Sequence, residues 1–90
     1  MSLDQRISVS EDTVFRELGG EAILLQLDAG MYYGLDPVGT RLWQLIAERG
    51  SLRDVFERAR EEFEVDPATL ERDLLSLVAQ LAEKNLVRLD

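Results

Sequence analysis

The chain has 90 residues, a formal net charge of −8 at pH 7, and neither cysteine nor histidine. This length fits one small domain, and the composition excludes disulfides, thiolate nucleophiles, Cys/His zinc sites and histidine-based catalytic triads. Nucleic acids and anionic membrane surfaces are unfavourable partners, because 18 acidic side chains oppose only 10 basic ones. No apolar run is long enough to span a membrane and no signal core is present, so we expect a cytoplasmic protein.

The N-terminal third predicts a three-stranded antiparallel β-meander within residues 12–35. A Gly-Gly turn separates the first two strands. The second strand alternates apolar and polar residues, which predicts that Ile23, Leu25 and Leu27 face the core. A short glycine-containing loop leads to the third strand, Met31–Leu35.

The remainder of the chain predicts three helices, near residues 37–49, 52–64 and 67–84. Each predicted helix follows a residue that favours the N-cap, and two of them begin with proline. The fold class is therefore α+β, in a single domain over residues 12–90. Residues 1–11 are polar, and we expect them to be loosely ordered. The predicted core comprises Ile23, Leu25, Leu42, Leu45, Phe56, Leu74 and Leu77.

The carboxylates offer the only candidate catalytic groups. Glu61, Glu62 and Glu64 cluster at the end of the second helix, where we interpret them as a solvated charge run. Asp28 and Asp36 flank the third strand, and turn and capping roles explain both without a bound cation. The glycines do not have the spacing of a nucleotide-binding loop. We therefore expect no enzyme activity, no metal and no cofactor.

The third helix carries more apolar residues than one packing face requires. One stripe consists of Leu70, Leu74, Leu77, Val78 and Leu81. A second stripe consists of Leu75, Ala79, Ala82 and Leu86. Either the helix is central and packs on several elements, or part of the second stripe lines a groove that a partner fills.

The third strand is an unprotected sheet edge in a three-stranded meander. Between Met31 and Leu35 it has large side chains on both faces, no charge and no proline. Such an edge can accept an added strand from a peptide or from a second copy of the chain. Alternatively, the C-terminal tail, at Val87 and Leu89, covers it.

Residues 27–43, Leu-Asp-Ala-Gly-Met-Tyr-Tyr-Gly-Leu-Asp-Pro-Val-Gly-Thr-Arg-Leu-Trp, resemble the central signature of PqqD-like proteins. In that pattern a strand with a G-x-Y-x-x-L core runs into a helix led by Asn or Asp. The third helix also resembles the family, with Asp73 before an L-x-x-L-V run and a closing Asn85-Leu86-Val87. The resemblance extends over about residues 12–89.

The resemblance implies a winged-helix-like domain that recognises ribosomally synthesised and post-translationally modified peptides. Such domains bind the leader of a precursor peptide as a fourth strand beside the third strand, in a groove bounded by the third helix. Free-standing members serve either PQQ-type cofactor biosynthesis with a radical enzyme or lasso-peptide maturation with a leader peptidase. We expect this chain to be a non-catalytic adaptor of that kind, with that modifying enzyme as its second partner.

The candidate peptide-binding residues are Met31, Tyr32, Tyr33, Gly34, Leu35, Arg72, Asp73, Leu75, Ser76 and Ala79. Backbone groups of the strand would supply affinity, and apolar pockets beside the helix would supply specificity. Asp73 and Arg72 would orient polar leader residues at the rim. Two alternatives remain open: a winged-helix DNA-binding regulator, which the charge disfavours, and a module that forms a weak homodimer through the edge strand.

Overall fold

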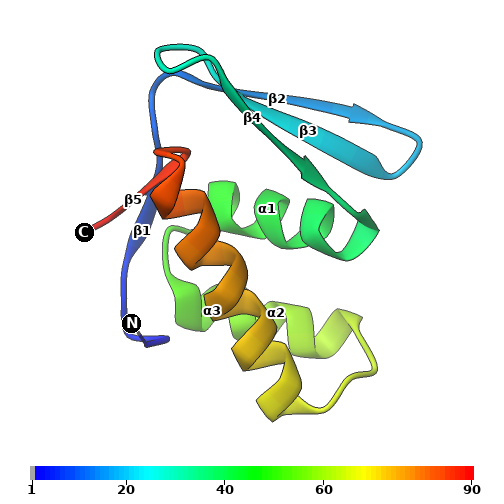
Figure 1. The fold of residues 1–90 in the computed structure, drawn as a ribbon. Helices are drawn as coiled ribbons and strands as arrows, with labels where there is room; N and C mark the ends of the chain where they lie inside the picture. The colour runs from blue at the N-terminus through cyan, green and yellow to red at the C-terminus, as the bar shows by residue number, and fades with distance from the viewer. Residues whose placement is uncertain (1) are drawn as a thin grey trace.

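A computed structural model describes residues 2–90 and places a three-stranded sheet beside three helices, of which the first packs on the sheet (Figure 1). Both chain ends lie together beside a separate two-stranded sheet. In chain order the elements are β1 (Ile7–Val9), β2 (Thr13–Leu18), β3 (Glu21–Gln26), β4 (Met31–Leu35), α1 (Pro37–Arg49), α2 (Leu52–Glu62), α3 (Pro67–Glu83) and β5 (Val87–Leu89). The α+β class and the order of three strands followed by three helices are confirmed.

The meander β2-β3-β4 forms as predicted, with antiparallel pairing throughout. Gly19 and Gly20 both have positive φ in the β2–β3 turn, which is the conformation that glycine adopts at least cost. β3 pairs with β2 on one side, where Leu18 lies opposite Glu21, and with β4 on the other, where Leu35 lies opposite Ala22. β3 is therefore the central strand. β4 is therefore an edge strand, as expected.

Each helix starts at the predicted cap. The side chains of Asp36, Ser51 and Asp66 accept hydrogen bonds from the backbone N–H three residues later, which satisfies one free donor of each first turn. Gly50, with φ of 70°, ends α1 in the left-handed conformation. Such local signals explain why the predicted helix limits agree with the structure to within two residues.

The face of β3 that packs on the helices is not the predicted one. Ala22, Leu24 and Gln26 are buried, whereas Ile23 and Leu25, 49% and 38% exposed, point away from the helices. The prediction is wrong because alternation identifies two faces but does not tell which one the helices cover. A polar residue is tolerated inside, since the Gln26 amide oxygen accepts a hydrogen bond from Ala29 N at 2.8 Å. Beyond β3, Leu27 is also exposed.

The N-terminal segment contributes more order than expected. Ile7–Val9 forms β1, which pairs antiparallel with β5 in the register Ile7↔Leu89 to Val9↔Val87. Leu3 and Ile7 are buried in the same core as the helices, so this segment is packed where the sequence predicted a loose one. The expectation failed because a three-residue strand has no local signal and depends on a partner about 80 residues away.

The core lies mainly among the three helices and extends to β1 and to one face of the sheet, with Leu42, Leu45, Phe56 and Leu74 buried as predicted. Leu77 is only half-buried, contrary to the prediction, and packs at the margin of the core. Among residues 2–90 no helix is both long enough and apolar enough to cross a membrane.

Candidate peptide-binding site

The outer edge of β4 is unpaired within the part of the chain that the structure describes. The C-terminal strand β5, which could have covered it, pairs with β1 instead. Tyr32 is 70% exposed and Met31 is also exposed, so neither side chain is packed into the fold. The N–H and C=O groups on this side of β4 are therefore open to an added strand.

A cleft of about 450 Å³ adjoins this edge. It lies between the end of β4, the first turns of α1 and one side of α3. Its apolar lining comes from Leu35, Val38, Leu42 and Leu77. The other lining residues are Tyr33, Gly34, Asp36, Gly39, Asp73, Ser76 and Gln80. A free strand edge next to an apolar cleft can bind an extended peptide through its backbone and one of its side chains together.

One hydrogen bond joins the two walls of the cleft. The Tyr33 hydroxyl donates to the Gln80 side-chain oxygen, which links β4 to α3. Tyr33 is half-buried and packs against the core with its ring. The bond therefore links β4 and α3 across the cleft.

The structure brings five of the predicted site residues to the cleft: Tyr33, Gly34, Leu35, Asp73 and Ser76. Met31 and Tyr32 lie on the same strand outside the cleft.

The predicted site residues on α3 divide into those that line the cleft, Asp73 and Ser76, and those that do not. Arg72, Leu75 and Ala79 do not line the cleft. Leu75 packs against the core and Ala79 is exposed. The wall residues recur at i, i+4 and i+7 from Asp73, and this spacing is the signal in the sequence that would have identified Leu77 and Gln80.

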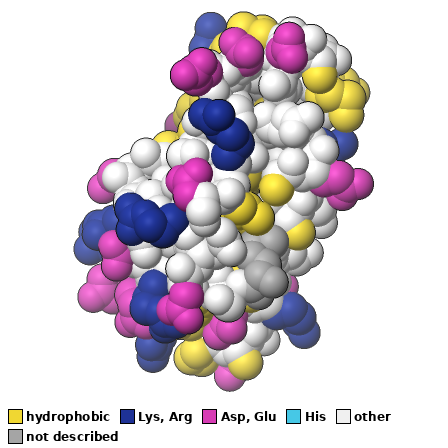
Figure 2. Space-filling view, turned by 90° about the vertical axis from the view of Figure 1, so that its left-hand side faces the viewer, with side chains coloured by type: hydrophobic (Ala, Val, Ile, Leu, Met, Phe, Trp, Pro, Cys, Tyr) yellow, Lys and Arg dark blue, Asp and Glu magenta, His cyan; other side chains and the backbone are white. Residues whose placement is uncertain are grey.

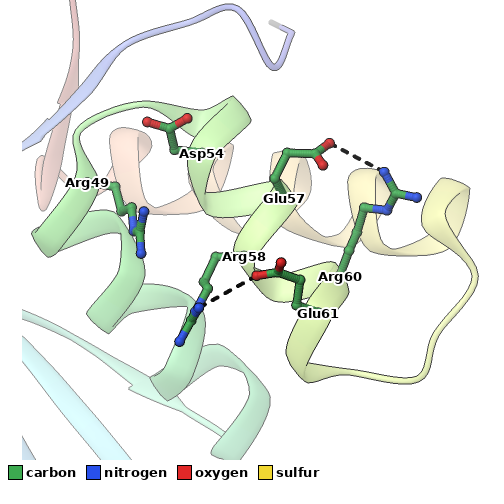
Figure 3. A pocket seen from close by; sticks show the side chains of 6 residues that line it. All are labelled: Arg49, Asp54, Glu57, Arg58, Arg60 and Glu61. Carbon is green, nitrogen blue, oxygen red and sulfur yellow. Dashed lines mark hydrogen bonds and ion pairs between the residues drawn. The ribbon is translucent and has the colours of Figure 1, made fainter.

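A second hollow, of about 440 Å³, lies over α2 and the end of α1 and is lined only by charged side chains (Figure 3). Glu57 and Glu61 reach toward Arg60 and Arg58, with nitrogen–oxygen distances of 3.4 and 3.6 Å. These pairs are exposed and have no apolar floor, so the hollow is a solvated surface and a poor peptide site.

Within the carboxylate cluster at the end of α2, Glu62 has a structural role. Glu62 accepts hydrogen bonds from Arg41 at 2.7 and 2.8 Å and from Arg58 at 3.1 Å, which ties the end of α2 to α1. These bonds lower the pKa of Glu62 to about 2, so it stays ionised at neutral pH and is unsuited to donate a proton. Across residues 2–90 no three Asp or Glu side chains converge in a metal-binding group.

Two solved structures that resemble this chain are complexes with leader peptides. The first, "TbiB1 in Complex with the TbiA(beta) Leader Peptide", has 36% sequence identity and a TM-score of 0.84 over 90% of this chain and 94% of that chain. The second, "Lasso peptide synthetase B1 complexed with the leader peptide", has 23% identity and a TM-score of 0.80 over 92% of this chain and 98% of that chain. The second similarity shows the fold alone. No curated protein matches the sequence significantly. The family model for coenzyme PQQ synthesis protein D (PqqD) matches residues 21–87, most of the chain, and the chain therefore belongs to the PqqD family.

Proposed function

We propose that this chain binds the leader segment of a ribosomally made precursor peptide and presents that precursor to a separate modifying enzyme. The observation that carries the proposal is the unpaired edge of β4 beside a cleft with an apolar floor. The family and the complex of the 36% identical TbiB1 with a leader peptide support it. In this proposal residues 12–90 form the peptide-binding domain, with β1 completing its core.

The leader adds to β4 as a fourth strand. Five residues of β4 span about 17 Å, which offers two or three outward N–H and C=O groups on each partner. Backbone pairing supplies affinity that depends little on sequence. Side chains of the leader alternate between the cleft and the opposite face of the sheet, so only every second leader residue contacts the cleft.

The chain itself performs no chemistry in this proposal. It has no histidine or cysteine, and the carboxylate with the most perturbed pKa, Glu62, is held in an ion pair away from the cleft. The chemistry belongs to the modifying enzyme, a leader peptidase or a radical enzyme, and the chain supplies recognition.

The charge distribution favours a peptide over DNA. On the face drawn in Figure 2, Lys and Arg side chains lie among Asp and Glu side chains and form no continuous basic area. Among the described residues, four arginines around α2 are already held in ion pairs. Arg41, Arg58 and Arg60 pair with glutamates of α2, and Arg53 pairs with Asp4. Phosphate contacts at Arg41, Arg53, Arg58 and Arg60 would have to displace these partners, and any phosphate contact would act against a net charge of −8.

The experiment is a proline scan of the β4 edge. Successive N–H groups of a strand alternate in direction, so one of Met31→Pro and Tyr32→Pro removes a donor to β3 and the other removes a donor at the free edge. Neither side chain lines the cleft, so the cleft is left unaltered. The probes are the TbiA(beta) leader peptide and the leaders of small precursor peptides encoded next to this chain.

The variant that has lost the edge donor should fold and should bind a leader at least about tenfold more weakly, since one main-chain hydrogen bond plus local strain contributes about 1.5–3 kcal/mol. Fluorescence anisotropy measures the binding, and thermal unfolding identifies the variant that folds. Unchanged binding of both probes by that folded variant would contradict strand addition at β4.

A further inference from the structure

The sheet has a second face, which no element covers in the part of the chain that the structure describes. Figure 1 shows α1 on one side of β2, β3 and β4 and no helix or strand on the other side. We call this other side the outer face. The strand pairing places eight residues on it: Val14, Arg16, Leu18, Glu21, Ile23, Leu25, Tyr32 and Gly34.

The outer face gathers exposed apolar side chains. Among residues 2–90 nine large hydrophobic side chains are exposed, and five of them lie on this face or directly beyond β3. These five are Leu18, Ile23, Leu25, Leu27 and Tyr32. Single exposed apolar residues are ordinary, but a contiguous patch of them marks a surface that another protein covers.

A hollow and an arginine without an acidic partner mark one end of the outer face. The hollow has a volume of about 670 Å³, and its lining includes Arg16, Leu18, Ile23 and Gly34. The Arg16 guanidinium donates to the Phe15 carbonyl at 3.1 Å, and among residues 2–90 no carboxylate forms an ion pair with it. Arginine and tyrosine among apolar side chains are typical of protein interfaces. A partner with an acidic side chain over Arg16 complements this end of the face.

The outer face continues into the edge at which the leader adds. Tyr32 belongs to the edge strand β4, and on the outer face it lies opposite Leu25. A leader strand paired with β4 places every second side chain on this same face, beside Tyr32. A protein that covers the outer face therefore contacts the chain and its bound leader together.

The size of the outer face disfavours a second copy of the chain as its occupant. Three strands of five or six residues, about 4.8 Å apart, present a flat area of about 300 Å². A stable complex buries about 800 Å² on each partner, and two copies would also bring together two net charges of −8. A partner that also contacts the leader strand has more surface to bury.

Building on the proposed function, we propose that the outer face is the docking surface for the modifying enzyme. The enzyme covers Ile23, Leu25 and Tyr32 with apolar side chains and places a carboxylate over Arg16. Because it also contacts the alternate side chains of the leader, it binds the loaded chain more tightly than the empty one. Docking therefore depends on the presence of a precursor.

The test measures how tightly the purified modifying enzyme encoded next to this chain binds to it. Biolayer interferometry is run with and without the leader of the neighbouring precursor peptide. The variant Ile23→Thr/Leu25→Thr makes the outer face polar with a residue that favours strands, and Arg16→Glu reverses its charge. Val65→Thr is the matched control, because Val65 is 47% exposed, close to the 49% of Ile23, and lies between α2 and α3 away from the sheet.

We expect the leader to tighten enzyme binding to the parent by about tenfold or more. Ile23→Thr/Leu25→Thr should weaken enzyme binding to the loaded chain at least about tenfold, since a few apolar residues near the centre of an interface carry much of its binding energy. Arg16→Glu should weaken it about three- to tenfold at 0.1 M salt, and less at high salt. Val65→Thr should bind the enzyme as the parent does.

Leader binding itself is the second readout. None of the substituted residues lines the cleft or belongs to β4, so all variants should bind the leader as the parent does in fluorescence anisotropy. Thermal unfolding checks that Ile23→Thr/Leu25→Thr is folded. If it is not, Arg16→Glu, at an exposed position, decides the question.

Several results would overturn docking at the outer face and leave leader binding at β4 intact. They are no enzyme binding to the loaded parent, enzyme binding that the folded outer-face variants retain in full, and enzyme binding that the leader does not change. Sedimentation of the parent as a dimer that Ile23→Thr/Leu25→Thr disrupts would show instead that a second copy covers the face. A leader that fails to bind the parent in the anisotropy assay would contradict the proposed function itself.

Discussion

Replacing Leu24 and Leu25 by alanine, one at a time, tests which face of the sheet is buried. The two residues are adjacent in β3 and belong to opposite faces. Leu24 is 0% exposed and lies opposite Phe15 and Tyr33 on the face that packs on the helices. Leu25 is 38% exposed and lies opposite Val14 and Tyr32 on the face that points away from the helices.

The two substitutions should differ by about 2 kcal/mol. Truncating a fully buried leucine costs 2–5 kcal/mol, and about 3 kcal/mol is expected for Leu24→Ala. Leu25→Ala leaves no enclosed cavity and loses only part of one side chain's burial, about 1 kcal/mol. For a chain of 90 residues an unfolding entropy of about 190 cal/mol/K converts these values into Tm decreases of about 16 °C and about 5 °C.

Circular dichroism during thermal unfolding measures both decreases, and urea titration checks that the slope with denaturant is unchanged. Leu24→Ala should be the less stable variant. An equal or larger decrease for Leu25→Ala would mean that Ile23, Leu25 and Leu27 face the core after all, and the described packing of the sheet would be wrong.

Three further predictions concern the ion pair, the glycines and nucleic acid. Glu62→Gln should lower the free energy of unfolding by about 1–2 kcal/mol at pH 7. Because the pKa of Glu62 is lowered from 4.5 to about 2, its contribution is complete above pH 4.5, and the difference between parent and variant in urea titrations should vanish as the pH falls toward 2. Gly50→Ala should destabilise by about 1 kcal/mol because φ is 70°, whereas Gly34→Ala, with no heavy atom within 4 Å of the added Cβ, should not lower Tm. Titration with random duplex DNA at physiological salt should give no binding tighter than about 10 μM, and sequence-dependent submicromolar binding would instead support a regulator.

Local chemistry made the helices and the meander predictable from the sequence. Asp36-Pro37 and Asp66-Pro67 mark helix starts. The aspartate caps the first turn, and the proline has no N–H at a position where the helix has no acceptor for one. The uncharged strand at Met31–Leu35 marks an edge, and the structure confirms that edge. Each of these signals resides within a few residues.

The features that were missed depend on contacts between distant parts of the chain. Both faces of β3 carry apolar residues, so only the position of the helices decides that Leu24 rather than Leu25 is buried. The pairing of β1 with β5 joins the two ends of the chain. On α3 the sequence left open whether the stripe with Leu75 packs on other elements or lines a groove. Leu75 packs against the core, and the cleft lies along Asp73, Leu77 and Gln80 instead.

Hydrogen exchange with and without a bound leader peptide tests the central claim most directly. If the leader adds as a strand beside β4, the amides of Met31–Leu35 that point away from β3 should gain protection when the peptide is present. The amides of β2, at the opposite edge of the sheet, should exchange at unchanged rates and serve as the internal control. Protection that appears on β2 or on α2, with β4 unaffected, would contradict the account.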